Sequence, residues 1–456
     1  MPQWLATVAA LTVLLVLGDG VLRMAARGVR LAWYERCALA WLCGTGAATI
    51  AWVLLAPAYR WLSPVWLVTA MALMLALAAR RPDARRKGSG AAGVTFSPTD
   101  AMLAAVVLLQ VGVLCAAAMW TTLGWDGLFN FELKARIAFE HSPAGQLPAA
   151  YFQDATRSWS HPRYPLLVPF TEFWIYSWLG RIDQSAVKIV FPLFYCSLIA
   201  LVCGAVRRVA SLRWALVTVI GLGCLPVLTL LPGASSGYAD VPLAASACGA
   251  ACFAFGALRT QDARYVNLAA ALLAVAVWTK AEGAILAGAI GLTALAAAGS
   301  TARRRFSALV WVPALAVASW YAVLTFHGAE AAKDFHAPGS QELASTIDAL
   351  AAVWPAVMRE LIRPGHWGLI WPAFFAAVLF MMTARRSTRA DWFLVGAVVI
   401  PLGVYAALYL FSAWPDVREH VGFSLPRLLV PLAPVATFFV VRRAAYELGV
   451  ESTEWA

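Results

Sequence analysis

Long apolar segments separated by short polar breaks run along the whole chain. A helix needs about 20 predominantly apolar residues to cross the hydrocarbon core of a bilayer, and many of these segments approach that length. The pattern therefore predicts an all-α polytopic membrane protein with about thirteen transmembrane helices. The expected spans are 4–21, 37–56, 62–79, 101–120, 186–206, 214–231, 239–258, 266–279, 283–298, 309–326, 368–383, 392–411 and 425–441.

Basic residues collect in alternate breaks, which the positive-inside rule assigns to the cytoplasm. This orientation places the amino end outside and the carboxyl tail inside. The basic breaks contain Arg23, Arg27 and Arg30; Arg80, Arg81, Arg85, Arg86 and Lys87; Arg207, Arg208 and Arg213; Arg259 and Arg264; Arg303, Arg304 and Arg305; Arg385, Arg386 and Arg389; and Arg442 and Arg443.

The alternation requires that the apolar piece 165–179 does not cross the membrane, because crossing would put every basic cluster from Arg207 onward outside. Since this piece contains Thr171 and Glu172, we expect an amphipathic or re-entrant helix on the outer surface, within the first long outer loop. A second irregularity is the polar stretch 279–283, which interrupts a long apolar run and predicts two short helices meeting at the outer face.

Composition agrees with a membrane protein: 62% of residues are hydrophobic, 13% are charged, and the net charge is +11. Because the basic residues lie mostly in breaks between spans, they indicate orientation and not nucleic-acid binding. The eight cysteines lie in apolar spans without CxxC spacing, which is typical of core residues. The first span lacks the features of a cleaved signal peptide.

We treat the chain as one integral unit with three parts. Residues 1–100 form amino-terminal transmembrane helices and a basic cytoplasmic loop, residues 101–441 form the transmembrane core, and residues 442–456 form a cytoplasmic tail. The core has outer loops at 121–185 and 327–367.

Candidate chemistry begins in the polar insert 124–164, because ionisable groups held against a bilayer are costly unless they are used or paired. Asp126 precedes Gly127, and a helix N-cap is a sufficient alternative role for it. Arg136 has the i,i+4 spacing to pair simply with Glu132 or with Glu140.

Asp240 enters the outer end of a later span, where a cap is again the alternative, helped by Pro242. Asp126 and Asp240 are expected at the same membrane level, where paired carboxylates could hold a cation or remove a proton.

Lys280 and Glu282 interrupt an apolar run at the outer side, where a lysine opposes the orientation rule. A local ion pair between them does not explain the interruption. Lys280, Arg163 and Arg427 could together clamp a phosphate, while interfacial snorkelling is the alternative for the two arginines.

The segment HGAEAAKDFH offers potential metal ligands, but its spacing matches no helical HxxxH arrangement and a solvated loop is favoured. These ligands are His327, Glu330, Asp334 and His336. The metal site is therefore left unassigned.

Five motifs in order resemble bacterial GT-C type membrane glycosyltransferases, relatives of the aminoarabinose lipid A transferase and the protein O-mannosyltransferases. The motifs are WDGLFNFELKARIAF, HPRYPLLVPFTEFWIY, GYADVPLA, WTKAEGAIL and SLPRLLVPLAP, within residues 101–441. The resemblance implies a GT-C-like fold. It also implies transfer of a sugar from a polyprenyl-phosphate donor to a lipid, glycan or protein acceptor at the non-cytoplasmic face of the plasma (inner) membrane.

The resemblance also implies roles. Asp126 matches the general base, Asp240 the second acidic position near the acceptor or a cation, and Lys280 a lysine near the donor phosphate. Arg163 and Arg427 would assist Lys280 at the phosphate. Residues expected to bind or support substrate are Glu132, Lys134, His161, Tyr238 and Glu282. No cofactor is implied with certainty, and a divalent cation stays open.

The chain departs from the family pattern because Gly127, and not a second acid, follows Asp126, and because Glu282 and Arg163 differ from the commonest forms. A transporter or flippase of a lipid-linked or small solute is the main alternative. A transporter would be expected to show repeats, paired broken helices and a midplane site. A non-catalytic subunit of an envelope complex is a third reading.

Overall fold

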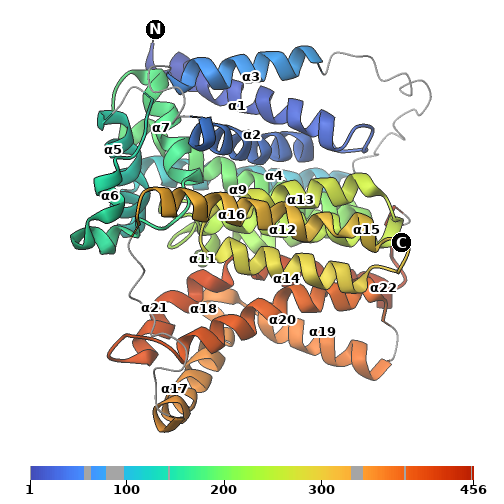
Figure 1. Cartoon of the computed structure of the whole chain (residues 1–456). Helices are drawn as coiled ribbons and strands as arrows, with labels where there is room; N and C mark the ends of the chain where they lie inside the picture. Colours follow the sequence, from blue (N-terminus) through green and yellow to red (C-terminus); the bar gives the residue numbers. More distant parts are fainter. Residues whose placement is uncertain are drawn as a thin grey trace.

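The computed structural model describes residues 2–55, 63–78, 97–141, 144–329, 343–384, 387–452 and 454–455. Every regular element in these ranges is a helix, and the long helices lie side by side as one bundle (Figure 1). The expectation of an all-α polytopic membrane protein is confirmed at this level.

Seven helical segments are long and apolar enough to cross a membrane. They are α1 (Gln3–Ala25), α2 (Trp33–Leu55), α4 (Pro98–Trp120), α8 (Gln184–Val187) with α9 (Val190–Val209), α12 (Asp240–Thr260), α15 (Arg303–Phe306) with α16 (Ala308–Phe326), and α20 (Arg389–Tyr409). These segments support a multi-pass membrane protein.

Five further apolar helices are shorter: α3 (Pro64–Ala78), α10 (Leu212–Gly223), α13 (Ala263–Thr279), α14 (Glu282–Ala297) and α19 (Ile370–Ala384). A bent pair, α21 (Val417–Leu429) and α22 (Ala433–Glu447), meets at 55°. A helix of α3's length extends only about 22 Å, less than the roughly 30 Å of a bilayer core. The total of about thirteen spans therefore stays a prediction.

The remaining helices connect these spans. They are the π-helix η1 (Gly127–Glu132), α5 (Leu133–His141), α6 (Ala149–Gln153), the 3₁₀-helix η2 (Ala155–Ser160), α7 (Leu167–Leu179), α11 (Pro226–Thr229), α17 (Leu343–Leu361) and α18 (Pro364–Trp367). Figure 1 shows α5, α6, α7, α17 and α21 at the left end of the bundle, whereas α15 and the carboxyl terminus lie at the right end. We call these the insert end and the tail end.

Helix α7 corrects one expectation. Its 13 residues extend about 20 Å, too short to cross a bilayer core. However, the stretch from Leu167 to Tyr176 is buried, so α7 is not an amphipathic helix with one face on the outer surface. Aromatic packing explains this burial, since Trp52 of α2 contacts Phe170 with ring centroids 4.8 Å apart.

At the tail end, a buried ion pair joins α9 to α2. Arg208 donates to both carboxylate oxygens of Glu35, with Nη2 2.8 Å from Oε2, and its side chain is 4% exposed. Gly204 makes room for this pair, because a Cβ there would lie 1.9 Å from Glu35 Oε1. An arginine interpreted as an orientation signal is therefore also a structural cation.

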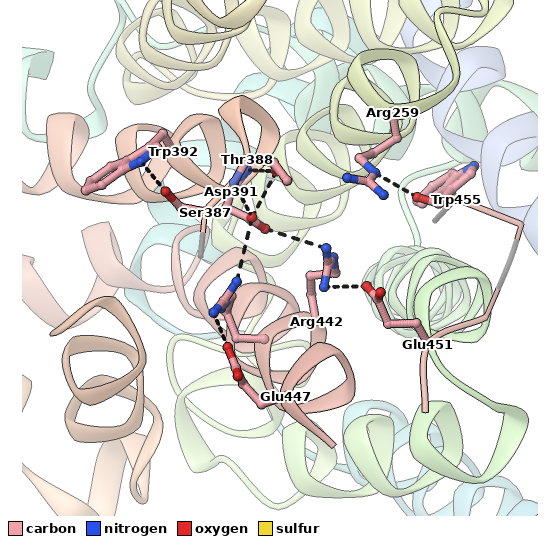
Figure 2. Close-up of polar contacts among 10 residues, drawn as sticks. Arg259, Ser387, Thr388, Asp391, Trp392, Arg442, Glu447, Glu451 and Trp455 are labelled. Carbon is pink, nitrogen blue, oxygen red and sulfur yellow. Dashed lines mark hydrogen bonds and ion pairs between the residues drawn. The ribbon is translucent and has the colours of Figure 1, made fainter. Parts of the chain in front are cut away.

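A second charged network encloses the end of α22 (Figure 2). The fully buried Asp391 lies 3.8 Å from Arg443 and 4.0 Å from Arg442, and Arg442 also pairs with Glu451 at 2.6 Å. These contacts hold the segment after α22 against the bundle.

The tail itself packs into the bundle. Trp455 is 1% exposed, and its indole fills the space above Gly256 of α12. The carbonyl oxygen of Trp455 accepts a hydrogen bond of 3.0 Å from Arg259, as Figure 2 shows. The predicted cytoplasmic tail is therefore a packed part of the fold.

We expect Glu35→Ala to lower the free energy of unfolding by about 3 kcal/mol, because it leaves the buried Arg208 guanidinium with only the half-exposed carboxylate of Glu454, 3.2 Å from its Nε. Thermal unfolding of the detergent-purified protein measures this effect. Asp19→Ala is the matched control, since Asp19 pairs with the more exposed Arg23 and Arg36 and should cost less than about 1 kcal/mol. Equal melting shifts in the two variants would contradict the prediction.

Candidate functional site

Arg427 of α21 joins two carboxylates from distant parts of the chain. Its Nη2 lies 2.5 Å from Asp126 Oδ2 and 3.3 Å from Asp240 Oδ2. The guanidinium also lies over the ring of Tyr238, 4.7 Å from the ring centroid. Three of the predicted site residues therefore meet around one arginine.

Lys280 extends this arrangement. Its Nζ lies 3.0 Å from Asp240 Oδ1 and 3.0 Å from Glu282 Oε1. Asp240 is fully buried and Lys280 is 2% exposed. We call Asp126, Asp240, Lys280, Glu282 and Arg427 the charged cluster.

Helix ends at the insert end of the bundle position these side chains. Asp126 lies between α4 and η1, Asp240 is the first residue of α12, and Lys280 is an extended residue between α13 and α14. The α13–α14 turn is tight enough to require Gly283, because a Cβ there would lie 2.0 Å from the carbonyl oxygen of Ala276.

Close backbone packing fixes Asp126 relative to Asp240. The amide of Gly124 donates to the carbonyl oxygen of Ser236 at 2.7 Å. A Cβ at Gly127 would lie 2.7 Å from that same oxygen and 3.3 Å from the Cα of Gly237. This packing gives a physical reason for glycine, and not a second acid, after Asp126.

Neither Asp126 nor Asp240 uses its carboxylate as a helix N-cap. Asp126 has helical dihedral angles and makes no side-chain cap, while its carboxylate contacts Arg427. Asp240 lies inside the first turn of α12, and Ala239 occupies the cap position. The carboxylates are paired with distant cations instead.

The cluster sets three carboxylates against two cations and retains unused hydrogen-bonding capacity. Among the described residues, Arg427 Nε and Glu282 Oε2 are buried without a partner. Lys280 has three donors, and its two acceptors in the cluster are Asp240 and Glu282. Arg427 and Lys280 therefore keep N–H donors that the carboxylates of the cluster do not occupy.

Lys134 is buried next to this cluster. It donates to Asn130 Oδ1 and, at 2.9 Å, to the carbonyl oxygen of His161. Burial lowers the pKa of Lys134 to about 7, and the Asp126 carboxylate opposes part of this shift. Lys134 therefore exchanges a proton near neutral pH, which its sequence position did not indicate.

His161 supports Lys134 through its backbone. The residue has a left-handed conformation with φ 45°, and its ring stacks on Tyr164 with centroids 4.7 Å apart. His161 thus contacts Lys134 through its carbonyl oxygen, and its role in binding or supporting substrate stays a prediction.

Glu132 is held by hydrogen bonds to neighbouring elements. It accepts from Arg136 at 2.7 Å, from the Tyr176 hydroxyl at 2.9 Å and from Gln184 at 2.7 Å. The i,i+4 pair of Glu132 with Arg136 is confirmed. Glu132 thus joins η1 and α5 to α7 and α8.

Arg163 contacts the region of α16. Its guanidinium donates to the carbonyl oxygen of Ala329 at 3.2 Å, and its own carbonyl accepts from Trp320 at 3.0 Å. These contacts hold the irregular segment before α7 against the end of α16. They do not by themselves indicate that Arg163 binds a phosphate.

Glu172 of α7 is a functional candidate that the sequence marks only as a polar residue in an apolar piece. It is fully buried, and within the described ranges neither carboxylate oxygen has a hydrogen-bond partner. Burial, together with the charge of Glu132, raises its pKa well above the usual range, so the neutral acid is favoured.

The potential metal ligands are only partly visible. Glu330, Asp334 and His336 lie outside the described residues, while the His327 ring stacks on Phe152 with centroids 4.7 Å apart. In the part of the chain that the structure describes, no group of three or more His, Cys, Asp or Glu residues is placed to hold a metal ion.

Comparison of the chain with protein-family models, with curated proteins and with solved structures finds no match. The site must therefore be interpreted from its own geometry.

We expect Gly127→Ala to destabilise the protein by about 1–3 kcal/mol, because the new Cβ overpacks against the backbone near Ser236. Thermal unfolding in detergent measures this change. Gly288→Ala in α14 is the control, since its Cβ would meet open space and should be neutral or stabilising. A Gly127→Ala variant as stable as the control would rule out the close approach.

Lys134 should make stability depend on pH. Its folded-state pKa of about 7 is below the ordinary 10.5, so the unfolded state binds more protons between these values and stability rises with pH across that window. From pH 7.5 to 9 the gain is about 2 kcal/mol relative to Lys134→Met. Melting curves of both proteins test this, and parallel pH profiles would contradict it.

Proposed function

We propose that the protein is a GT-C type membrane glycosyltransferase that moves a sugar from a polyprenyl-phosphate donor to an envelope acceptor. The observation that carries this proposal is the meeting of Asp126, Asp240, Lys280 and Arg427 at the insert end of the bundle. The five sequence motifs of the GT-C resemblance contain all four residues.

The proposed reaction is a direct displacement. The acceptor hydroxyl forms a bond to the anomeric carbon, the bond from that carbon to the phosphate oxygen breaks, and polyprenyl phosphate leaves. Arg427 occupies Asp126 Oδ2, so Oδ1 is the atom we assign to receive the hydroxyl proton. A single displacement inverts the anomeric configuration.

Cations beside the leaving phosphate would stabilise the charge that develops there. Lys280 and Arg427 fit this role, because each retains donor capacity while bound to carboxylates. Asp240 holds both cations and is therefore a positioning residue in this scheme. Lys134, with its pKa of about 7, supports Asp126 electrostatically.

Exposed aromatic residues beside Asp126 agree with a site near the lipid headgroups. Trp125 is 61% exposed and packs against Phe129 with ring centroids 4.6 Å apart, and Phe129 in turn contacts Trp159. Aromatic residues favour the membrane–water interface. We propose that this interface is at the non-cytoplasmic face of the plasma membrane, because the described basic residues Arg208, Arg259, Arg442 and Arg443 lie at the tail end.

A transporter or flippase is the second candidate, and the bent pair of α21 and α22 favours it. This bend adds a second interruption to the break between α13 and α14. Broken helices in transporters surround a site near the bilayer midplane. Here both interruptions contribute to a cluster at one end of the bundle, which supports the transferase.

Asp126→Asn and Lys280→Met should each lower sugar transfer at least about 100-fold, because one removes the proton acceptor and the other a phosphate cation. The measurement is mass spectrometry of envelope lipids and glycans in cells lacking the gene and complemented with each variant at matched protein level. Glu140→Gln, a change of an exposed carboxylate in the same insert, should retain transfer.

If cells lacking the gene lose a glycan or lipid product and both variants restore it, the roles assigned to Asp126 and Lys280 are wrong. Unchanged envelope products together with altered solute or lipid movement across the membrane would favour the transporter.

A further inference from the structure

A groove separate from the charged cluster lies between α17 and α21 at the insert end. Its volume is about 680 Å³, within the range of ligand pockets. Small and apolar residues form much of its wall, among them Ala352, Pro355, Ala356 and Gly422. The groove is therefore large enough for part of an apolar chain.

Three arginines line this groove: Arg359, Arg363 and Arg418. One carboxylate, Glu360, also lines it, but its Oε1 accepts from Trp367 at 3.0 Å and its Oε2 lies 3.6 Å from Arg363. Among the described residues, Arg359 and Arg418 have no carboxylate partner. The groove therefore has an excess of positive charge.

Exposed apolar side chains are also present on the helices that form the groove. Ile362 is 65% exposed and lines the groove; Trp354 and Phe423, on the two helices that form it, are 59% and 65% exposed. Guanidinium groups bind phosphate oxygens in bidentate geometry, whereas apolar side chains at this level favour hydrocarbon. Together they match an anionic amphiphile better than a free anion.

We propose that the α17–α21 groove binds a membrane lipid with an anionic phosphate headgroup. Arg359 and Arg418 contact the phosphate, and the apolar rim holds the first part of the hydrocarbon chain. Arg418 and Arg427 are nine positions apart on α21, roughly 13 Å along the helix. The groove therefore neighbours the charged cluster, but lipid binding there does not depend on the transferase proposal.

The test uses the full chain purified in detergent and native mass spectrometry with dioleoylphosphatidylglycerol or dioleoylphosphatidylcholine. We expect at least about tenfold tighter retention of phosphatidylglycerol, and loss of that preference in Arg359→Gln/Arg418→Gln. Gly422→Leu should also weaken retention, because its side chain enters the groove while its Cβ meets no heavy atom within 4 Å. Leucine also favours the helix.

Arg181→Gln is the control, because it removes an exposed arginine at the same end but outside the groove, and should leave retention unchanged. Equal retention of both lipids, or unchanged phosphatidylglycerol retention in Gly422→Leu, would overturn the proposal. Displacement of the lipid by millimolar inorganic phosphate would also overturn it, since the groove would then recognise the free anion.

Discussion

The buried bridge from Asp126 through Arg427 and Asp240 to Lys280 is the constraint on which the insert end depends. A charge removed from water must be paired, because leaving one buried and alone costs several kcal/mol. Here each charge has its partner on another segment, so η1, α12, α21 and the α13–α14 turn are fixed in relation to one another. The same pairing that stabilises the fold thus brings together the carboxylates and cations that could take part in chemistry.

The tail end obeys the same rule with different residues. Arg208 and Glu35 join α9 to α2, and Asp391 lies among the arginines of α22. Between the two ends, α12 is buried along its apolar span and packs mainly through alanine, glycine and cysteine. The protein thus separates its ion pairs into two layers, with close packing of small side chains between them.

Periodicity and motif order predicted much of this arrangement. Apolar segments indicated the helices, and the misplaced Lys280 marked the break between α13 and α14, because both signals are local. The pairing of Asp126 with Arg427 spans 301 positions and depends on the packing of several helices, so no local pattern specifies it. The burial of α7 excludes the amphipathic surface helix and leaves the re-entrant one; it could not be predicted because it comes from contacts with other segments. The contact of His161 with Lys134 is made by a backbone carbonyl oxygen, which residue identity does not encode.

The packing of Trp455 has a consequence for how the bundle is closed. The indole covers Gly256, contacts the rings of Phe255 and Tyr265, and lies 5.1 Å from the Arg208 guanidinium. The Trp455 side chain thus fills the space that α12 leaves at Gly256, which has no Cβ. Cleavage of the few residues that hold it would let water reach the Arg208–Glu35 pair, although every transmembrane helix stayed intact.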